Sequence, residues 1–322
     1  MPDSTSSGFF RRVFWGPWGL RAGWRLVLFN AALFLAVTLA KLGLGAVLGK
    51  DPGWTAASFI LIEAAFLAAS AACVYLMARI ERRRFADYGF TRQGAFGRLF
   101  WEGGLWGLAT IGAVVGAMAL AGGYTVRGLS LRGTDILIYA FLWAAAFLIA
   151  SLFEELVFRG YELFTAASGM RFWPAAVVLS AIFGFYLHFA QKPNETLADG
   201  LSVSLIALFF CLTVRRTGNL WFAIGWHWTF NFGSMFVFGF PNTGNRGGLP
   251  LPGHLLDALT HGSQLLTGGP MGAEASLTIF PVLAVLVAAF HFRYRTVRYP
   301  VDGRRGLSQN LSGGQKDIRP RL

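Results

Sequence analysis

The chain has 322 residues, of which 55% are hydrophobic and only 14% are charged, and its mean hydropathy is +0.51. Soluble domains carry about 25% charged residues, so this composition excludes an ordinary soluble globular protein. The 31 Phe, 11 Trp and 8 Tyr exclude disorder over most of the length. Only two cysteines are present, so a disulfide-stapled scaffold is excluded as well, and we interpret Cys73 and Cys211 as buried, unpaired thiols. The remaining class is a polytopic membrane protein.

Eight apolar stretches predict membrane-spanning helices of about 20 residues each, and hence an all-α bundle. In chain order they are residues 24–49, 54–78, 100–122, 135–158, 172–190, 200–214, 219–240 and 276–292. The expected organisation has five parts. They are an N-terminal tail (residues 1–23), a first group of helices (24–134), a core (135–240), an irregular outer loop (241–275), and a last helix with a basic tail (276–322).

The basic residues predict the orientation of the bundle. With the N-terminus inside, 22 of the 28 Lys and Arg residues fall in inner segments, five fall in outer segments, and Lys41 lies within the first span. Lys and Arg concentrate on the cytoplasmic side of membrane proteins, so both termini are expected in the cytoplasm. This distribution also explains the net charge of +12 without a nucleic-acid partner. The expected location is the cell (inner) membrane, with the lipid bilayer as partner.

The fourth stretch carries charges that a membrane span does not normally tolerate. An ionisable residue there costs about 2.5–3.5 kcal/mol on insertion scales, so each one needs a reason. Glu155, Arg159 and Glu162 follow one helical face, while Glu154 points about 100° away from Glu155. The simplest interpretation is a helix end at the cytoplasmic surface, where Glu155 and Arg159 form an ion pair. The other interpretation is a functional site inside the membrane.

Two further stretches carry polar residues in apolar surroundings. The fifth contains His188, and the seventh contains His227 and Asn231 one helical turn apart. A single such His is usually a hydrogen-bonded core residue. Two of them, with an Asn and a carboxylate pair, supply a general base, a second proton carrier and an oxyanion donor. Signatures of other protease chemistries are absent. The sequence contains no His-Glu-x-x-His zinc motif, no Gly-x-Ser-x-Gly serine motif and no Asp in the middle of a span.

Together these residues resemble the three motifs of the CPBP family, the intramembrane endopeptidases of the CAAX prenyl protease 2 or Abi type. The matching segments are Glu154-Glu155-Leu-Val-Phe-Arg159, an apolar helix ending in His188, and His227-Trp-Thr-Phe-Asn231, preceded by Gly218-Asn-Leu-Trp221. The resemblance covers about residues 135–240, and the first 130 residues add further helices. The second motif departs from the family pattern, because Gly184 stands where the family usually has Phe, four residues before the His.

The resemblance implies a multi-pass endopeptidase that hydrolyses a peptide bond in a membrane-associated protein or peptide. Glu154, with His188, would activate a water molecule, and His227 and Asn231 would bind the oxyanion of the tetrahedral intermediate. Glu155 and Arg159 would hold the helix in register, or Arg159 would hold a substrate carboxylate. Two alternatives stay open, an inactive scaffold or immunity factor of the same fold and a proton-coupled transporter. The transporter is disfavoured because the chain shows no inverted repeat.

A metal and the depth of the motifs are two further expectations. Bacterial members of the family are usually named metalloproteases, and Glu154, His188 and His227 are the candidate zinc ligands, although a glutamate-activated water without metal fits the residues equally well.

The predicted boundaries place Glu154 near the inner face and His188 nearer the outer face. The motifs can therefore meet only where a helix starts deeper, tilts, or breaks at Pro174 or Gly160.

Overall fold

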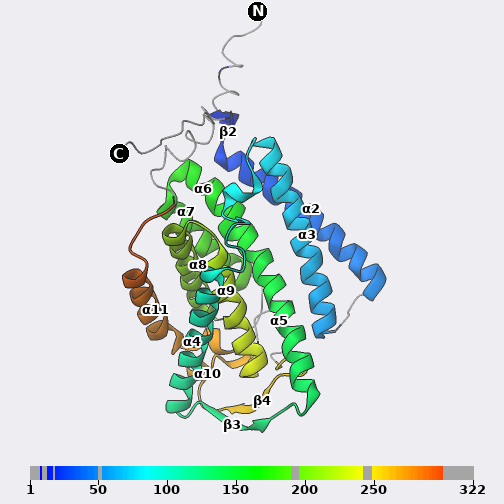
Figure 1. Cartoon of the computed structure of the whole chain (residues 1–322), viewed down its shortest axis with the longest axis vertical. Coiled ribbons are helices and arrows are strands. Elements are labelled where there is room, and N and C mark those ends of the chain that lie inside the picture. The colour runs from blue at the N-terminus through cyan, green and yellow to red at the C-terminus, as the bar shows by residue number, and fades with distance from the viewer. Residues whose placement is uncertain are drawn as a thin grey trace, which may run out of the picture.

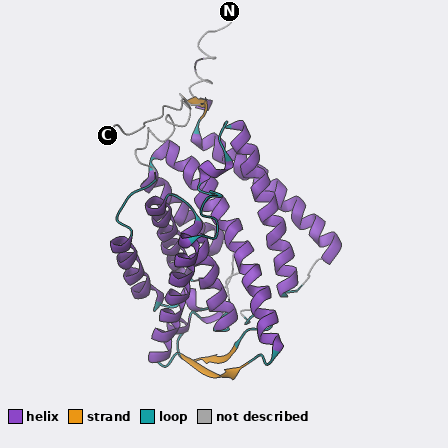
Figure 2. Ribbon diagram, in the orientation of Figure 1, coloured by secondary structure: helices purple, strands orange, loops and turns teal. Residues whose placement is uncertain are grey.

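The computed structural model describes residues 8, 13–16, 19–49, 53–189, 196–241 and 249–299, and it confirms the predicted all-α class (Figure 1, Figure 2). The helices are α2 (Ala22–Leu48), α3 (Ala56–Ile80), α4 (Arg98–Leu120), α5 (Thr134–Glu154), α6 (Leu163–Met170), α7 (Phe172–Ala181), α8 (Leu197–Thr217), α9 (Trp221–Asn231), α10 (Gln264–Thr267) and α11 (Ile279–Arg293). Three π-helical stretches extend them, η2 (Glu155–Glu162), η3 (Ile182–Phe189) and η4 (Phe232–Val237). The predicted tail after residue 300 lies outside the described residues.

All eight predicted spans are helical, and six of them are long and apolar enough to cross a membrane. The protein is therefore a multi-pass membrane protein. The two shorter ones are α9 with its π-helical extension and α11, which has 15 residues. Both cysteines are buried and free, as predicted.

The fourth span differs most from its prediction, because it continues well past residue 158. Helix α5, the π-helical stretch η2 and α6 form one run of 37 residues, Thr134–Met170. Of the charges that suggested a helix end, Glu155, Arg159 and Glu162 are instead buried within this run, and Glu154 lies in its middle with a partly exposed side chain. The helix does not break at Gly160, which lies inside η2, nor at Pro174, which stands in the first turn of α7, where proline is tolerated.

The two ends of the bundle separate the predicted inner and outer segments. At the end that is uppermost in Figure 1, Arg25 contacts Glu81 and Ser168, so the start of α2 meets the ends of α3 and α6. At the opposite end, β3 (Tyr124–Leu129) pairs antiparallel with β4 (Leu256–Thr260). The outer loop, predicted to be irregular, thus contains a strand and the short helix α10, because β3 supplies β4 with a hydrogen-bonding partner.

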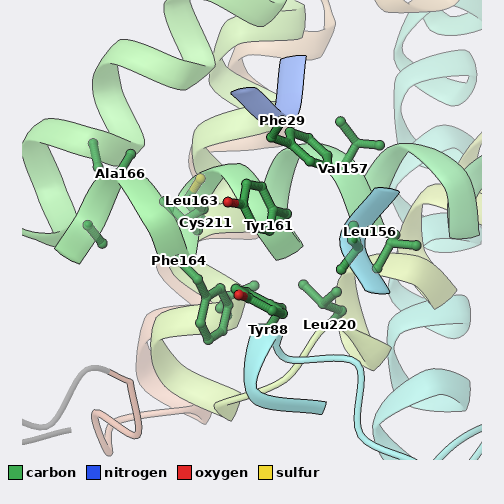
Figure 3. Packing of buried hydrophobic residues seen from close by; sticks show 14 of the residues in the cluster. Phe29, Tyr88, Leu156, Val157, Tyr161, Leu163, Phe164, Ala166, Cys211 and Leu220 are labelled. Carbon is green, nitrogen blue, oxygen red and sulfur yellow. The ribbon is translucent and has the colours of Figure 1, made fainter. Parts of the chain in front are cut away.

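A buried aromatic cluster ties the N-terminal helices to the long fourth span (Figure 3). Tyr161 of η2 packs against Phe29 of α2 and against Tyr88 of the 3₁₀ turn η1 (Phe85–Tyr88), with ring centroids 4.1 and 5.1 Å apart. Its hydroxyl donates a hydrogen bond of 2.6 Å to Glu81, which directly follows α3. This cluster fixes the C-terminal half of the run that carries Glu154.

Helix α4 positions α9 by packing directly against its backbone. A Cβ added at Gly107 would lie 2.2 Å from the Trp226 carbonyl oxygen, and one at Gly103 would lie 2.1 Å from the Phe222 carbonyl oxygen. No side chain fits at these distances, so the glycines permit the close approach. Helix α9, which carries His227, therefore takes its place from α4.

This packing predicts that Gly107→Ala destabilises the protein by about 1–3 kcal/mol, because the added methyl group overpacks the interface. The matched control is Gly112→Ala on the same helix, where nothing lies within 4 Å of the added atom. Thermal unfolding of both variants in detergent measures the difference. Equal midpoints would show that the α4–α9 contact does not need glycine.

Candidate active site

Each of the three motifs lies at or beside a π-helical stretch. Glu154 directly precedes η2, His188 lies in η3, and Asn231 directly precedes η4. The described residues contain these three π-helical stretches and no others. Because π-helical turns are rare and often occur at functional sites, their coincidence with the motifs makes this region the candidate site.

Glu155 joins the first motif to the third. Its Oε1 accepts a hydrogen bond of 3.0 Å from Arg159 Nη1 and lies 3.1 Å from His227 Nδ1. The side chain of Glu155 is fully buried, and that of Arg159 is 3% exposed. The predicted ion pair is therefore present, and it lies in the protein interior. It fixes η2 against α9.

Glu154 approaches the other nitrogen of the same imidazole. Its Oε2 lies 3.9 Å from His227 Nε2, so the two adjacent glutamates face the ring from two sides. The side chain of Glu154 is 31% exposed, whereas that of Glu155 is buried. Of the carboxylate pair, Glu154 is therefore the accessible one. An oxygen atom placed beside this 3.9 Å gap would lie within hydrogen-bond distance of both Glu154 and His227.

Aromatic rings hold Arg159 and connect it to His188. The guanidinium carbon lies 4.6 Å from the ring centroid of Phe183 and 4.9 Å from that of Phe210. The Phe183 ring also packs against His188, with centroids 4.9 Å apart. The three motifs thus converge on one region. The burial of Arg159 and its pairing with Glu155 favour a structural role over the binding of a substrate carboxylate.

The departure at Gly184 has a steric cause. A Cβ at this position would lie 2.1 Å from Ser204 Oγ and 2.3 Å from the carbonyl oxygen of Gly200 on α8. Helix α8 therefore approaches η3 too closely for any side chain at residue 184. The neighbouring Phe183 provides the aromatic contact to His188 and Arg159.

The remaining predicted site residues occupy different surroundings. Asn231 is the last residue of α9, one turn beyond His227, and is partly buried. Glu162 is buried and hydrogen-bonded to Asn30, so it links η2 to α2.

The sequence prediction missed Glu63 of α3, which interacts electrostatically with Glu154 and with Lys41. Its signal was a single acidic residue in an otherwise apolar stretch.

The candidate zinc ligands do not fit a metal centre. Structural and catalytic zinc sites use at least three protein ligands at about 2.0–2.3 Å from the ion. Within the described ranges, no group of three His, Cys, Asp or Glu residues is arranged to hold a metal. Glu154 and His227 approach one another, but His188 meets this region through the ring of Phe183.

The comparison with protein families agrees with the motifs. Residues 136–233 match the family model described as Type II CAAX prenyl endopeptidase Rce1-like. The chain matches no curated protein and no solved structure. The matched segment contains all six residues predicted to act in the site, namely Glu154, Glu155, Arg159, His188, His227 and Asn231. Over this segment the match supports the resemblance to the CAAX prenyl endopeptidase family that the motifs predicted.

Proposed function

We propose that the protein is an integral membrane endopeptidase that hydrolyses a peptide bond of a membrane-associated protein or peptide in the cell (inner) membrane. One observation carries this proposal. Glu154 is a partly exposed carboxylate within a membrane span, and its oxygen lies 3.9 Å from His227 Nε2. An intramembrane acid beside a histidine supplies the groups that general acid–base catalysis needs.

Glu154 acts as the base in this proposal. It removes a proton from a water molecule, whose oxygen attacks the scissile carbonyl carbon and forms a tetrahedral oxyanion. Glu154 then returns the proton to the amide nitrogen as the C–N bond breaks. The products are a carboxylic acid and an amine, and the glutamate is regenerated. His188, whose ring packs against Phe183, assists Glu154 in this proton transfer.

His227 and Asn231 stabilise the oxyanion. The carboxylate of Glu155 holds His227 Nδ1 as a donor, which directs Nε2 toward Glu154. With His227 protonated, the two carboxylates, Arg159 and the imidazolium sum to zero charge, which a low-dielectric interior favours. The Nε2–H then donates to the oxyanion, and the Asn231 amide, one turn further along α9, is the second donor.

Asn231→Ala is expected to lower kcat by about 10²- to 10³-fold with little change in KM, because an oxyanion donor acts mainly in the transition state. Steady-state kinetics on a cleaved peptide measures both constants. The matched control is Asn219→Ala, whose side-chain oxygen accepts from the Trp221 N–H at the start of α9. This control is expected to lower stability and to preserve kcat. An unchanged kcat in Asn231→Ala would remove Asn231 from the oxyanion site.

The activity itself is tested with a library of membrane-tethered peptides and purified protein in liposomes. We expect the wild type to cleave members of the library and Glu154→Gln to cleave none. Glu102→Gln, which alters a carboxylate paired with Arg98 on α4, serves as the control and should cleave normally. A folded wild type without product in any lane would favour the inactive scaffold of the same fold.

Metal removal distinguishes a zinc-dependent hydrolysis from hydrolysis by a glutamate-activated water without metal. We expect a zinc chelator to change the cleavage rate by less than about 2-fold, because no step of the proposed mechanism needs a bound ion; the lack of a three-ligand group among the described residues supports this expectation. The chelated protein is also checked for its metal content by atomic absorption. Loss of activity on chelation that zinc restores would contradict the metal-free mechanism.

A further inference from the structure

The segment that follows α11, residues 294–299, is fixed to α6 and to the end of α8. The backbone N–H groups of Arg298 and Tyr299 donate hydrogen bonds of 2.9 and 3.1 Å to the carbonyl oxygen of Arg215 on α8. The Tyr299 ring stacks on that of Phe164 of α6, with ring centroids 4.1 Å apart. In Figure 1 the segment runs from α11 toward α6 and α7, at the end of the bundle that is predicted to face the cytoplasm. We call these residues the docked segment.

The docked segment brings two pairs of arginines together. Arg215 and Arg216 are adjacent near the end of α8, and Arg295 and Arg298 lie on the docked segment. The guanidinium group of Arg216 donates a hydrogen bond to the carbonyl oxygen of Arg295, 79 positions away in the sequence. Arg298 packs so closely on Gly218, just after α8, that a Cβ added there would lie 3.3 Å from its own Cβ. These four arginines form one surface feature, the arginine patch.

The arginine patch has no acidic partner in the part of the chain that the structure describes. None of its four members forms an ion pair there. Several other arginines at this end of the bundle do contact a carboxylate, namely Arg25 and Arg83 with Glu81, Arg84 with Asp87, and Arg98 and Arg293 with Glu102. Like charges that are held together repel and destabilise the compact state. The patch therefore favours an anion as its ligand.

Aromatic rings and exposure place the arginine patch at the depth of the lipid headgroups. The guanidinium carbon of Arg215 lies 5.0 Å from the ring centroid of Phe172 and 5.7 Å from that of Trp173, both in the first turn of α7. Trp173 is 42% exposed, and tryptophan concentrates at the boundary between the hydrocarbon core and the headgroups. Arg295 and Arg298 are exposed as well, so a ligand at this boundary can reach them.

We propose that the arginine patch binds the phosphate headgroup of an anionic phospholipid in the adjacent leaflet. Guanidinium groups bind phosphate oxygens through paired N–H donors, and basic pockets between membrane helices on the cytoplasmic side bind anionic headgroups. The rings of Phe172 and Trp173 beside Arg215 favour a lipid over a free anion, because they offer apolar contact to its acyl chains. The bound lipid then joins the end of α8 to the docked segment and neutralises charges that the chain leaves unpaired.

Binding of phosphatidylglycerol to the purified full chain in neutral detergent, followed by native mass spectrometry, tests the site. Arg295→Gln/Arg298→Gln removes two charges but keeps the backbone atoms that hold the docked segment. We expect this variant to weaken binding about 5-fold for each arginine removed, and Arg295→Lys/Arg298→Lys to bind within about 3-fold of the wild type, because the headgroup responds to the positive charge. Should the double variant not fold, Arg298→Gln alone is expected to weaken binding about 5-fold.

The matched control changes the same number of charges at the same end of the bundle. Arg84→Gln/Arg98→Gln removes two arginines that already pair with carboxylates. We expect this control to bind within about 2-fold of the wild type, since the arginines that it removes are not those that meet the lipid. Unchanged binding in Arg295→Gln/Arg298→Gln, or an equal loss in the control, would overturn the arginine patch as the site.

Three competitors identify the occupant. Phosphatidylcholine, inorganic phosphate and an oligoglutamate peptide are each added to the wild type with phosphatidylglycerol at equal concentration. We expect none of them to displace the phosphatidylglycerol. Displacement by inorganic phosphate or by oligoglutamate would overturn a lipid as the occupant, and displacement by phosphatidylcholine would overturn recognition of an anionic headgroup.

Discussion

Glu154→Gln is expected to lower kcat by about 10²- to 10⁴-fold, the range over which a positioned acid–base group contributes to a rate. The amide is similar in size to the carboxylate but cannot accept the proton of the attacking water. The side chain is 31% exposed and makes no ion pair shorter than 3.9 Å among the described residues, so the fold should tolerate the change. The measurement is kcat on a cleaved library peptide, with the unfolding temperature recorded in parallel.

Glu155→Gln provides the internal comparison for this variant. The neighbouring glutamate is buried and pairs with Arg159 and His227, so its replacement should lower the unfolding temperature as well as the rate. Glu154→Gln is therefore expected to lower kcat alone, whereas Glu155→Gln is expected to lower both kcat and the unfolding temperature. Equal activity of Glu154→Gln and the wild type would exclude Glu154 as the base.

Arg159→Met is expected to destabilise the protein by about 3–5 kcal/mol, because removal of one partner of a buried ion pair leaves an uncompensated charge. The charge left behind is that of Glu155, whose side chain is fully buried. The free energy of unfolding in detergent, from denaturant titration, measures the loss. Glu155→Gln/Arg159→Met should recover most of the lost stability, because neither residue then carries a charge.

The chain offers a matched control for this pair. Arg98 and Glu102 on α4 have the same spacing of four residues, but the Arg98 side chain is 76% exposed. Arg98→Met should leave the unfolding midpoint nearly unchanged, since solvent-exposed pairs contribute little to stability. Similar losses in Arg98→Met and Arg159→Met would show that burial of the Glu155–Arg159 pair is not what stabilises the protein.

The positions of the helices follow from the sequence because the bilayer imposes a length and an apolar composition on each span. All eight predicted stretches are helical, with ends shifted by a few residues in most cases. The fourth span is the exception, and its error has a physical cause. Charges that usually mark a helix end are tolerated at Glu155 and Arg159 because they neutralise one another in the interior.

The candidate site shows the same limit of local sequence patterns. The spacing of Glu155 and Arg159 predicted their ion pair, and the motifs identified the six residues. The π-helical stretches that bring these residues together depend on packing between helices, which no local pattern encodes. The position of Glu63 on α3 was likewise hidden, because α3 packs against α5 only in the folded bundle.

The steric requirements on glycine illustrate this dependence on tertiary contacts. Gly184 departs from the family pattern, yet a side chain there would collide with α8. Gly107 permits α4 to reach the backbone of α9, and so determines where His227 lies. Neither requirement is visible before the neighbouring helix is placed.

The most direct test of the central claim is to run the cleavage in water enriched in ¹⁸O. Hydrolysis by a Glu154-activated water predicts that one ¹⁸O atom enters the new carboxyl group of the N-terminal product in the first turnover, and that Glu154→Gln gives no labelled product. Mass spectrometry of both fragments reads this out. Product without the label, or labelled product at the wild-type rate in Glu154→Gln, would contradict the account.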